Sequence, residues 1–284
     1  MLRRYVTEQP TSQLAVWARR MALFSLAAAF LAVIIVHLDL LEIRPALATV
    51  AGALALAVIA LLLAFAAFVV IWKDGLKGMG YSLTAIGIGV GLLGYPAYLG
   101  INAYKLPWIY DITTDPIDYP RYVALARSRP RDANPVIYAG LATAEQQRNA
   151  YPDIEPLEVD APPQAAYQAA LAVITKRKWR IVDPRPPERG SDGRIEAVAR
   201  SLLMGFRDDV VVRIRADGEG SRIDIRSSSR YGSLDFGSNA ARIRALLEDI
   251  DAVADAKKPE PVKPPPKKAK GPPAKSTERQ SGRR

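Results

Sequence analysis

Uncharged, apolar stretches dominate the first third of the chain. Residues 46–72 and 79–101 contain no charged side chain. Each exceeds the roughly 20 apolar residues that a helix needs to cross about 30 Å of hydrocarbon. A third apolar stretch, residues 21–38, is near the lower limit for a span, and we interpret it as an uncleaved helix rather than a signal peptide because no small-residue cleavage site follows it. The pattern predicts a region of three transmembrane helices over residues 21–101.

Small residues recur at helical spacing within the two longer stretches. They are alanines in the first stretch, and glycines with one threonine in the second: Ala53, Ala57, Ala60, Ala64 and Ala67, then Gly80, Thr84, Gly87, Gly91 and Gly94. Steps of three and four residues line one face of a helix, and small side chains let membrane helices approach closely. We expect the two faces to meet in an antiparallel hairpin. The alternative is that such residues are simply common in membrane helices.

Positive charge predicts the orientation of these helices, because the cytoplasmic loops of membrane proteins are enriched in lysine and arginine. Basic residues gather before the first span and between the second and third: Arg3, Arg4, Arg19, Arg20, Lys73 and Lys77. Residues 1–20 are then cytoplasmic, and the chain after residue 101 lies outside. For a bacterium, this predicts a multi-pass protein of the cell inner membrane with its carboxyl-terminal domain in the periplasm.

A different pattern follows the spans. Residues 102–160 contain seven prolines among many aromatic side chains, which predicts an irregular segment that wraps over a folded domain, with a short helix near residues 142–150. Residues 161–254 show helical spacing at both ends, with Ser238 as the expected cap of the last helix. Between these ends lie four stretches with the alternation of half-buried strands, at residues 179–182, 194–201, 210–215 and 222–226.

The predicted fold class is therefore α+β. Three transmembrane α-helices precede a two-layer α/β domain, a four-stranded antiparallel meander in the order α-β-β-β-β-α. Since one face of the predicted sheet is apolar and the other charged, both helices should cover the same face.

Most of the net charge of +10 belongs to the carboxyl-terminal end. Lysine and proline make up about half of residues 255–284, which cannot bury a core and are expected to be disordered. From residue 257 onward, ten lysines and arginines oppose two glutamates, a net charge of +8. The remainder is nearly balanced, so we expect no nucleic acid partner. The tail either binds anionic lipid or stays solvated. The absence of cysteine excludes disulfides and thiolate chemistry.

Several motifs occur in order along the soluble part. They are DITTDP at residues 111–116 with Pro120 and Arg121 after it, GFRDDVVVRI at 205–214, DIRSSSR at 224–230 and DFGSNAARI at 235–243. Over residues 108–253 the chain resembles the bacterial and plastid family called domain of unknown function 1499, and its three spans are similar to those of membrane-anchored members. The resemblance implies a small α/β domain, and no activity, cofactor or catalytic residue.

Few side chains suit catalysis or metal binding. His37 is the only histidine and lies at a membrane boundary, which excludes a Ser-His-Asp triad or a histidine metal site in the soluble part. Asp208 and Asp209 are adjacent in a strand, so they should point to opposite faces. Three carboxylates could hold a hard cation, although turn caps are the more ordinary role: Asp111, Asp115 and Asp118. We expect no catalytic residue, metal or cofactor.

The best candidate site lies where the last strand ends and the last helix begins. Free amide groups and the dipole at a helix N-terminus favour an anion, and nearby arginines would converge on it. The residues of this hypothetical phosphate or carboxylate site are Arg226, Ser229, Arg230, Ser238, Asn239 and Arg242. The alternative is an ordinary Ser or Asn cap with solvated arginines.

These patterns together predict a non-enzymatic inner-membrane protein that presents a periplasmic binding domain. Its partners would be the lipid bilayer and either an anionic lipid, another envelope component or a protein. One alternative is a carrier that holds a lipid or small apolar molecule between sheet and helices, which a cavity above about 300 Å³ would favour. A second is an envelope hydrolase, which requires two facing carboxylates.

Overall fold

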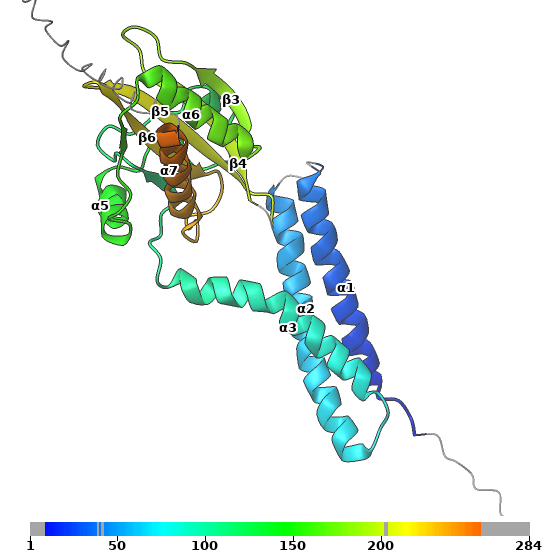
Figure 1. Ribbon diagram of the computed structural model, residues 1–284. Helices are drawn as coiled ribbons and strands as arrows, with labels where there is room; N and C mark the ends of the chain where they lie inside the picture. The colour runs from blue at the N-terminus through cyan, green and yellow to red at the C-terminus, as the bar shows by residue number, and fades with distance from the viewer. Residues whose placement is uncertain (1–8, 39, 41–42, 202–203, 257–284) are drawn as a thin grey trace, which may run out of the picture.

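A computed structural model describes residues 9–38, 40, 43–201 and 204–256. Figure 1 shows a bundle of long helices beside a separate domain built on a sheet. The bundle contains α1 (Gln13–His37), α2 (Ile43–Asp74) and α3 (Met79–Ala103). All three are long and apolar enough to cross a membrane, which confirms the prediction of three apolar helices in this part of the chain. Arg3, Arg4 and residues 257–284 of the predicted tail (255–284) lie outside the described residues.

Small side chains form the interior of the bundle, and the predicted alanine face of α2 is buried in full. It packs against a similar face of α1, where Ala18 and Ala22 meet Ala60 and Ala64. Close approach of this kind also lets a hydroxyl bond across helices, and Ser82 of α3 donates to the carbonyl oxygen of Ala64 at 2.5 Å.

The predicted glycine face of α3 does not face α2, and that interpretation is wrong. A Cβ added to Gly80, Gly87, Gly91 or Gly94 would meet no atom within 4 Å. The buried residues of α3 are instead Ser82, Ala85 and Gly89. The sequence offers two small-residue faces on α1 and α2 as well as the one on α3, and the first two pair with each other.

α3 leaves the bundle partway along its length, and Figure 1 shows its second half turning away from α1 and α2 toward the sheet. Pro96 lies inside this helix. Proline has no amide hydrogen and its ring clashes with the preceding turn, so it kinks a helix. No described residue of α3 beyond Gly89 is buried, which agrees with its departure from the bundle.

The two ends of the bundle differ in what they contact. At one end, the segment before α1 lies beside the α2–α3 connection, where the amide of Ser12 donates to the carbonyl oxygen of Lys77 at 2.9 Å. At the other end, α1 finishes and α2 starts against the sheet domain. The basic residues Lys73 and Lys77 are thus at the end far from the domain.

The sheet contains six antiparallel strands rather than the predicted four. The predicted meander is present, as β3 (Arg180–Arg185), β4 (Gly193–Arg200), β5 (Arg207–Asp217) and β6 (Gly220–Ser229). Two short strands from the proline-rich segment pair with the free side of β6, namely β1 (Asp111–Thr113) and β2 (Leu157–Val159). Beyond β1, the carboxamide of Gln147 on α5 (Leu141–Ala150) accepts from the amide of Thr113 and donates to its carbonyl oxygen.

Helices cover one face of the sheet, as predicted. α6 (Pro163–Lys176) and α7 (Ser238–Ala256) bury a core of aliphatic side chains against it. The proline-rich segment and α4 (Ala124–Ser128) cover the opposite face. There the buried carboxylate of Glu196 accepts from the amides of Val123, Ala124 and Leu125, which docks the start of α4 on the charged face.

Candidate functional site

Alternation along β6 separates the residues of the predicted anion site. Ser227 and Ser229 face α7, where they bond Asn239. Arg226 and Arg230 point to the opposite face, where Arg226 pairs with Asp111 of the proline-rich segment and Arg230 pairs with Asp209 of β5. Successive side chains of a strand point to opposite faces, so the two arginines lie across the sheet from the start of α7.

Arg226 is the centre of a buried ion pair. Its guanidinium donates to Asp111 through two hydrogen bonds, Nε to Oδ1 at 2.9 Å and Nη2 to Oδ2 at 2.6 Å. It also donates to the carbonyl oxygen of Val136 at 2.8 Å. The rings of Tyr119 and Tyr122 lie 4.9 and 4.7 Å from its central carbon. Burial raises the pKa of Asp111, against the opposing effect of Arg226. Such an arrangement holds the proline-rich segment on the sheet.

On the helix side, the structure brings together Ser229, Asn239 and Arg242. Asn239 donates from Nδ2 to Ser229 Oγ at 2.9 Å. Arg242 donates to Ser227 Oγ at 2.9 Å and forms an ion pair with Asp208. Burial raises the pKa of Asp208, and Arg242 opposes this shift.

The start of α7 already has an acidic cap. Asp235 accepts from the amide of Gly237 at 2.9 Å and from the amide of Asn239 at 2.8 Å. The expected cap, Ser238, is therefore wrong, because a carboxylate three residues earlier occupies the amides that a cap would use. Burial raises the pKa of Asp235, and these two amides act in the opposite direction. An exogenous anion at these amides would have to displace Asp235, so the predicted site remains a hypothesis.

Asp209 is shared by two arginines. It accepts from Arg230 Nη2 at 2.7 Å and lies 2.7 Å from Arg129 Nη2, and the side chains of all three residues are at most 4% exposed. As predicted, Asp208 and Asp209 point to opposite faces of the sheet. Two buried guanidiniums thus share one carboxylate, which leaves this cluster with an excess of positive charge.

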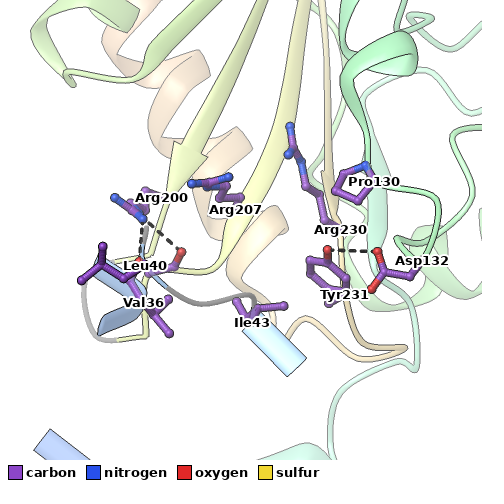
Figure 2. A pocket seen from close by; sticks show the side chains of 10 residues that line it. Val36, Leu40, Ile43, Pro130, Asp132, Arg200, Arg207, Arg230 and Tyr231 are labelled. Atoms are coloured by element: carbon purple, nitrogen blue, oxygen red, sulfur yellow. Dashed lines mark hydrogen bonds between the residues drawn. The ribbon is translucent and has the colours of Figure 1, made fainter. Parts of the chain in front are cut away.

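A pocket of about 360 Å³ opens beside this cluster, where the bundle meets the sheet domain. Figure 2 shows its lining, and we call it the junction pocket. The helical bundle, with the connection between α1 and α2, contributes an apolar wall, and the sheet domain contributes a wall rich in arginine: Val36, Leu40 and Ile43, then Pro130, Asp132, Arg200, Gly205, Arg207, Arg230 and Tyr231. Of the residues predicted for an anion site, the pocket includes Arg230.

Two arginines fasten the sheet domain to the helix ends around this pocket. Arg200, at the end of β4, donates to the carbonyl oxygens of Val36 at 3.0 Å and His37 at 3.2 Å. Arg44, near the start of α2, forms an ion pair with Asp132 at 3.0 Å. The carbonyl groups in the last turn of a helix have no partner within the helix, so the guanidinium of Arg200 satisfies groups that α1 leaves open.

The carboxylates considered for a cation face arginines instead. Asp115 pairs with Arg222 at 2.7 Å, and Asp118 pairs with Arg215 at 2.7 Å. Among the residues that the structure describes, no three His, Cys, Asp or Glu side chains gather as a metal ion would require. Between the sheet and α6 and α7, where a carrier would hold its ligand, the space is filled by side chains that include Tyr167, Ile174, Ile214, Ile243 and Leu246.

Comparison with known proteins identifies the sheet domain. Residues 111–250 match the family model described as "Protein of unknown function (DUF1499)". No curated protein matches the chain.

Solved structures with some likeness include TTHA0849 from Thermus thermophilus, at 15% identity over 37% of this chain and 97% of that chain, with a TM-score of 0.21. The structure of Ara h 8.0201 is 10% identical over 36% of this chain and 95% of its own, with a TM-score of 0.22. CalU16 from Micromonospora echinospora is 14% identical over 36% of this chain and 83% of its own, with a TM-score of 0.18. Scores this low carry no argument.

Proposed function

For this chain, which belongs to the DUF1499 family through residues 111–250, we propose a non-enzymatic role as an inner-membrane protein that holds a binding domain at the periplasmic surface of the bilayer. The observation that carries the proposal is the attachment of the sheet domain to the ends of α1 and α2, through Arg200 and Arg44. A domain fixed in this way remains next to the membrane surface, where lipids and other envelope components are within its reach.

The distribution of charge supports the proposed orientation. Lys73 and Lys77 lie at the end of the bundle far from the sheet domain, beside the segment that precedes α1. Cytoplasmic loops attract such residues, so the amino terminus would be cytoplasmic and the domain periplasmic.

The state of the buried carboxylates supports a role without catalysis. An envelope hydrolase needs two carboxylates that face one another across a cleft. Asp111, Asp208 and Asp209 each face an arginine, at Arg226, Arg242 and Arg230. His37, the single histidine, bonds the carbonyl oxygen of Val33 and is the last residue of α1.

A pair of reporter fusions tests the orientation. Alkaline phosphatase fused after Lys105 should be active, and green fluorescent protein at the same position should be dark, because the first folds only in the periplasm and the second only in the cytoplasm. Fusions after Asp74 should give the opposite pair of results and serve as the control. A fluorescent fusion after Lys105 would overturn the periplasmic placement.

A further inference from the structure

We propose that the junction pocket binds the phosphate of an anionic phospholipid headgroup. This inference rests on the function proposed above and names the chemical class of its ligand. It concerns a different place from the start of α7 and shares only Arg230 with the predicted anion site.

Charge at the pocket favours an anion. The described residues that line it include three guanidiniums, those of Arg200, Arg207 and Arg230, and one carboxylate, that of Asp132. Asp132 is already paired with Arg44, and Asp209 behind Arg230 is shared with Arg129. The guanidiniums also make contacts within the protein, so a phosphate would share their donors. Arginine suits this role because its planar fork of five N–H groups matches the oxygens of a phosphate.

The second wall of the pocket favours a lipid over a free ion. All three residues of this wall are aliphatic: Val36 and Ile43 lie at the ends of two helices that are long and apolar enough to span a membrane, and Leu40 lies between them in the chain. The ends of such helices lie at the level of the lipid headgroups. A phospholipid offers a phosphate to the arginines and a glycerol and acyl region to this wall. A volume of about 360 Å³ is within the range of small-molecule sites.

The headgroup should carry a net negative charge. A phosphatidylcholine headgroup contains the same phosphate, but its quaternary ammonium would be repelled by the neighbouring guanidiniums. A phosphatidylglycerol headgroup has no compensating cation, so it should bind more tightly. Inorganic phosphate has the charge but lacks the apolar part, so it should bind more weakly.

The test uses the full chain in micelles of a neutral detergent. The protein is titrated with dihexanoyl-phosphatidylglycerol, dihexanoyl-phosphatidylcholine or sodium phosphate, and binding is followed by thermophoresis. Dihexanoyl-phosphatidylglycerol should bind about tenfold more tightly than the other two ligands, because the choline ammonium is repelled and inorganic phosphate lacks the apolar part. Arg207→Gln should weaken the binding of this lipid about fivefold or more, because it removes one charge-assisted contact to the phosphate.

Arg185→Gln provides a matched control. This arginine lies on β3, is 65% exposed and pairs with Asp183 away from the pocket. The Arg185→Gln variant loses the same charge as Arg207→Gln but at a distance from the pocket, so its affinity for dihexanoyl-phosphatidylglycerol should be unchanged. Thermal unfolding without lipid shows whether Arg207→Gln retains the fold, and Arg207→Lys, which keeps the charge, should recover part of the affinity.

Equal binding of the two lipids, or equal losses in Arg207→Gln and Arg185→Gln, would overturn the proposal. If sodium phosphate binds as tightly as dihexanoyl-phosphatidylglycerol, the pocket is a site for a free anion, and the proposal that its ligand is a lipid is overturned. The titration in micelles does not depend on sidedness, and the reporter fusions do not depend on the pocket, so either proposal can fail alone.

Discussion

Arg200 donates from Nη2 to the carbonyl oxygen of Val36 at 3.0 Å, although 164 residues separate the two. The bond joins the end of β4 to the last turn of α1. Cationic side chains near a helix C-terminus stabilise it through its free carbonyl groups and its dipole. The same bond fixes the sheet domain on the bundle, so it serves the stability of α1 and the position of the domain together.

Arg200→Ala should loosen the sheet domain from the bundle, because it removes the donor to Val36 and His37. The chain has no cysteine, so spin labels would attach solely to two introduced cysteines, Leu26→Cys on α1 and Arg185→Cys on β3. The distance distribution between them should be narrow in the parent and broad in the Arg200→Ala variant. Arg180→Ala, which removes an exposed arginine of β3 whose cross-strand neighbour is Val198, is the control and should keep the narrow distribution.

Ala64→Leu should destabilise the bundle, because Ala64 is fully buried and its carbonyl oxygen accepts from Ser82. Overpacking of a filled interior costs about 1–3 kcal/mol. Gly87→Leu should be tolerated, since a side chain there points into open space. Thermal unfolding in detergent measures both. An equal loss in Gly87→Leu would instead support the glycine face as a packing surface.

Asp111→Asn should lower the free energy of unfolding of the sheet domain by about 3–5 kcal/mol, because it leaves the charge of Arg226 buried without a carboxylate. Asp111→Leu combined with Arg226→Met should recover much of that loss, since neither charge then remains buried. The measurement is chemical unfolding of the full chain in detergent. If the double variant is less stable than Asp111→Asn, the ion pair itself stabilises the fold, and the loss in Asp111→Asn is not explained by an unpaired buried charge alone.

Asp235→Ala should destabilise α7 by about 1 kcal/mol or more, the usual cost of losing a helix cap. Asp235 accepts from two amides at the start of this helix. Ser238→Ala should have a much smaller effect, because the amides are already satisfied. Unfolding of the two single variants compared with the parent decides between the two candidate caps, and a larger loss in Ser238→Ala would contradict the observed geometry.

The ion pair between Asp153 and Arg244 predicts a dependence on pH. A side-chain hydrogen bond from Arg244 holds the pKa of Asp153 below its ordinary value of 3.8. A carboxyl with a lowered pKa contributes stability above that ordinary value, and the contribution disappears as the pH falls through the folded-state pKa. The pair is about half exposed, so it should contribute below about 1 kcal/mol. Asp153→Asn should be less stable than the parent at pH 7, and the two proteins should be equally stable at a pH below the folded-state pKa of Asp153. A difference that persists after the parent's Asp153 is protonated would contradict this assignment.

Hydrophobic pattern alone predicted the spans and the four long strands, because these elements bury continuous or alternating apolar faces. It did not predict β1 and β2, which have three residues each. A run that short contains too few positions for alternation to appear. These strands form because β6 offers a free side along its length, which is a property of the assembled sheet.

The sequence did indicate that the residues of the predicted anion site lie on opposite faces of the sheet. Ile223 and Ile225 alternate with Asp224 and Arg226, so the side chain of Arg226 belongs to the charged face. Both helices were expected on the apolar face, which already placed Arg226 away from α7. The junction pocket had no such signal, since it depends on contacts between residues as distant as Val36 and Arg200.

The carboxamide of Gln147 bonds both backbone groups of Thr113 on the outer side of β1. An exposed strand edge is a template on which another chain can add a strand. With its amide and carbonyl groups taken, Thr113 offers nothing to such a strand. On the opposite border of the sheet, Pro184 interrupts β3 with a residue that has no amide hydrogen. Both borders of the sheet therefore lack at least one of the backbone groups through which the sheet of a second copy could extend it.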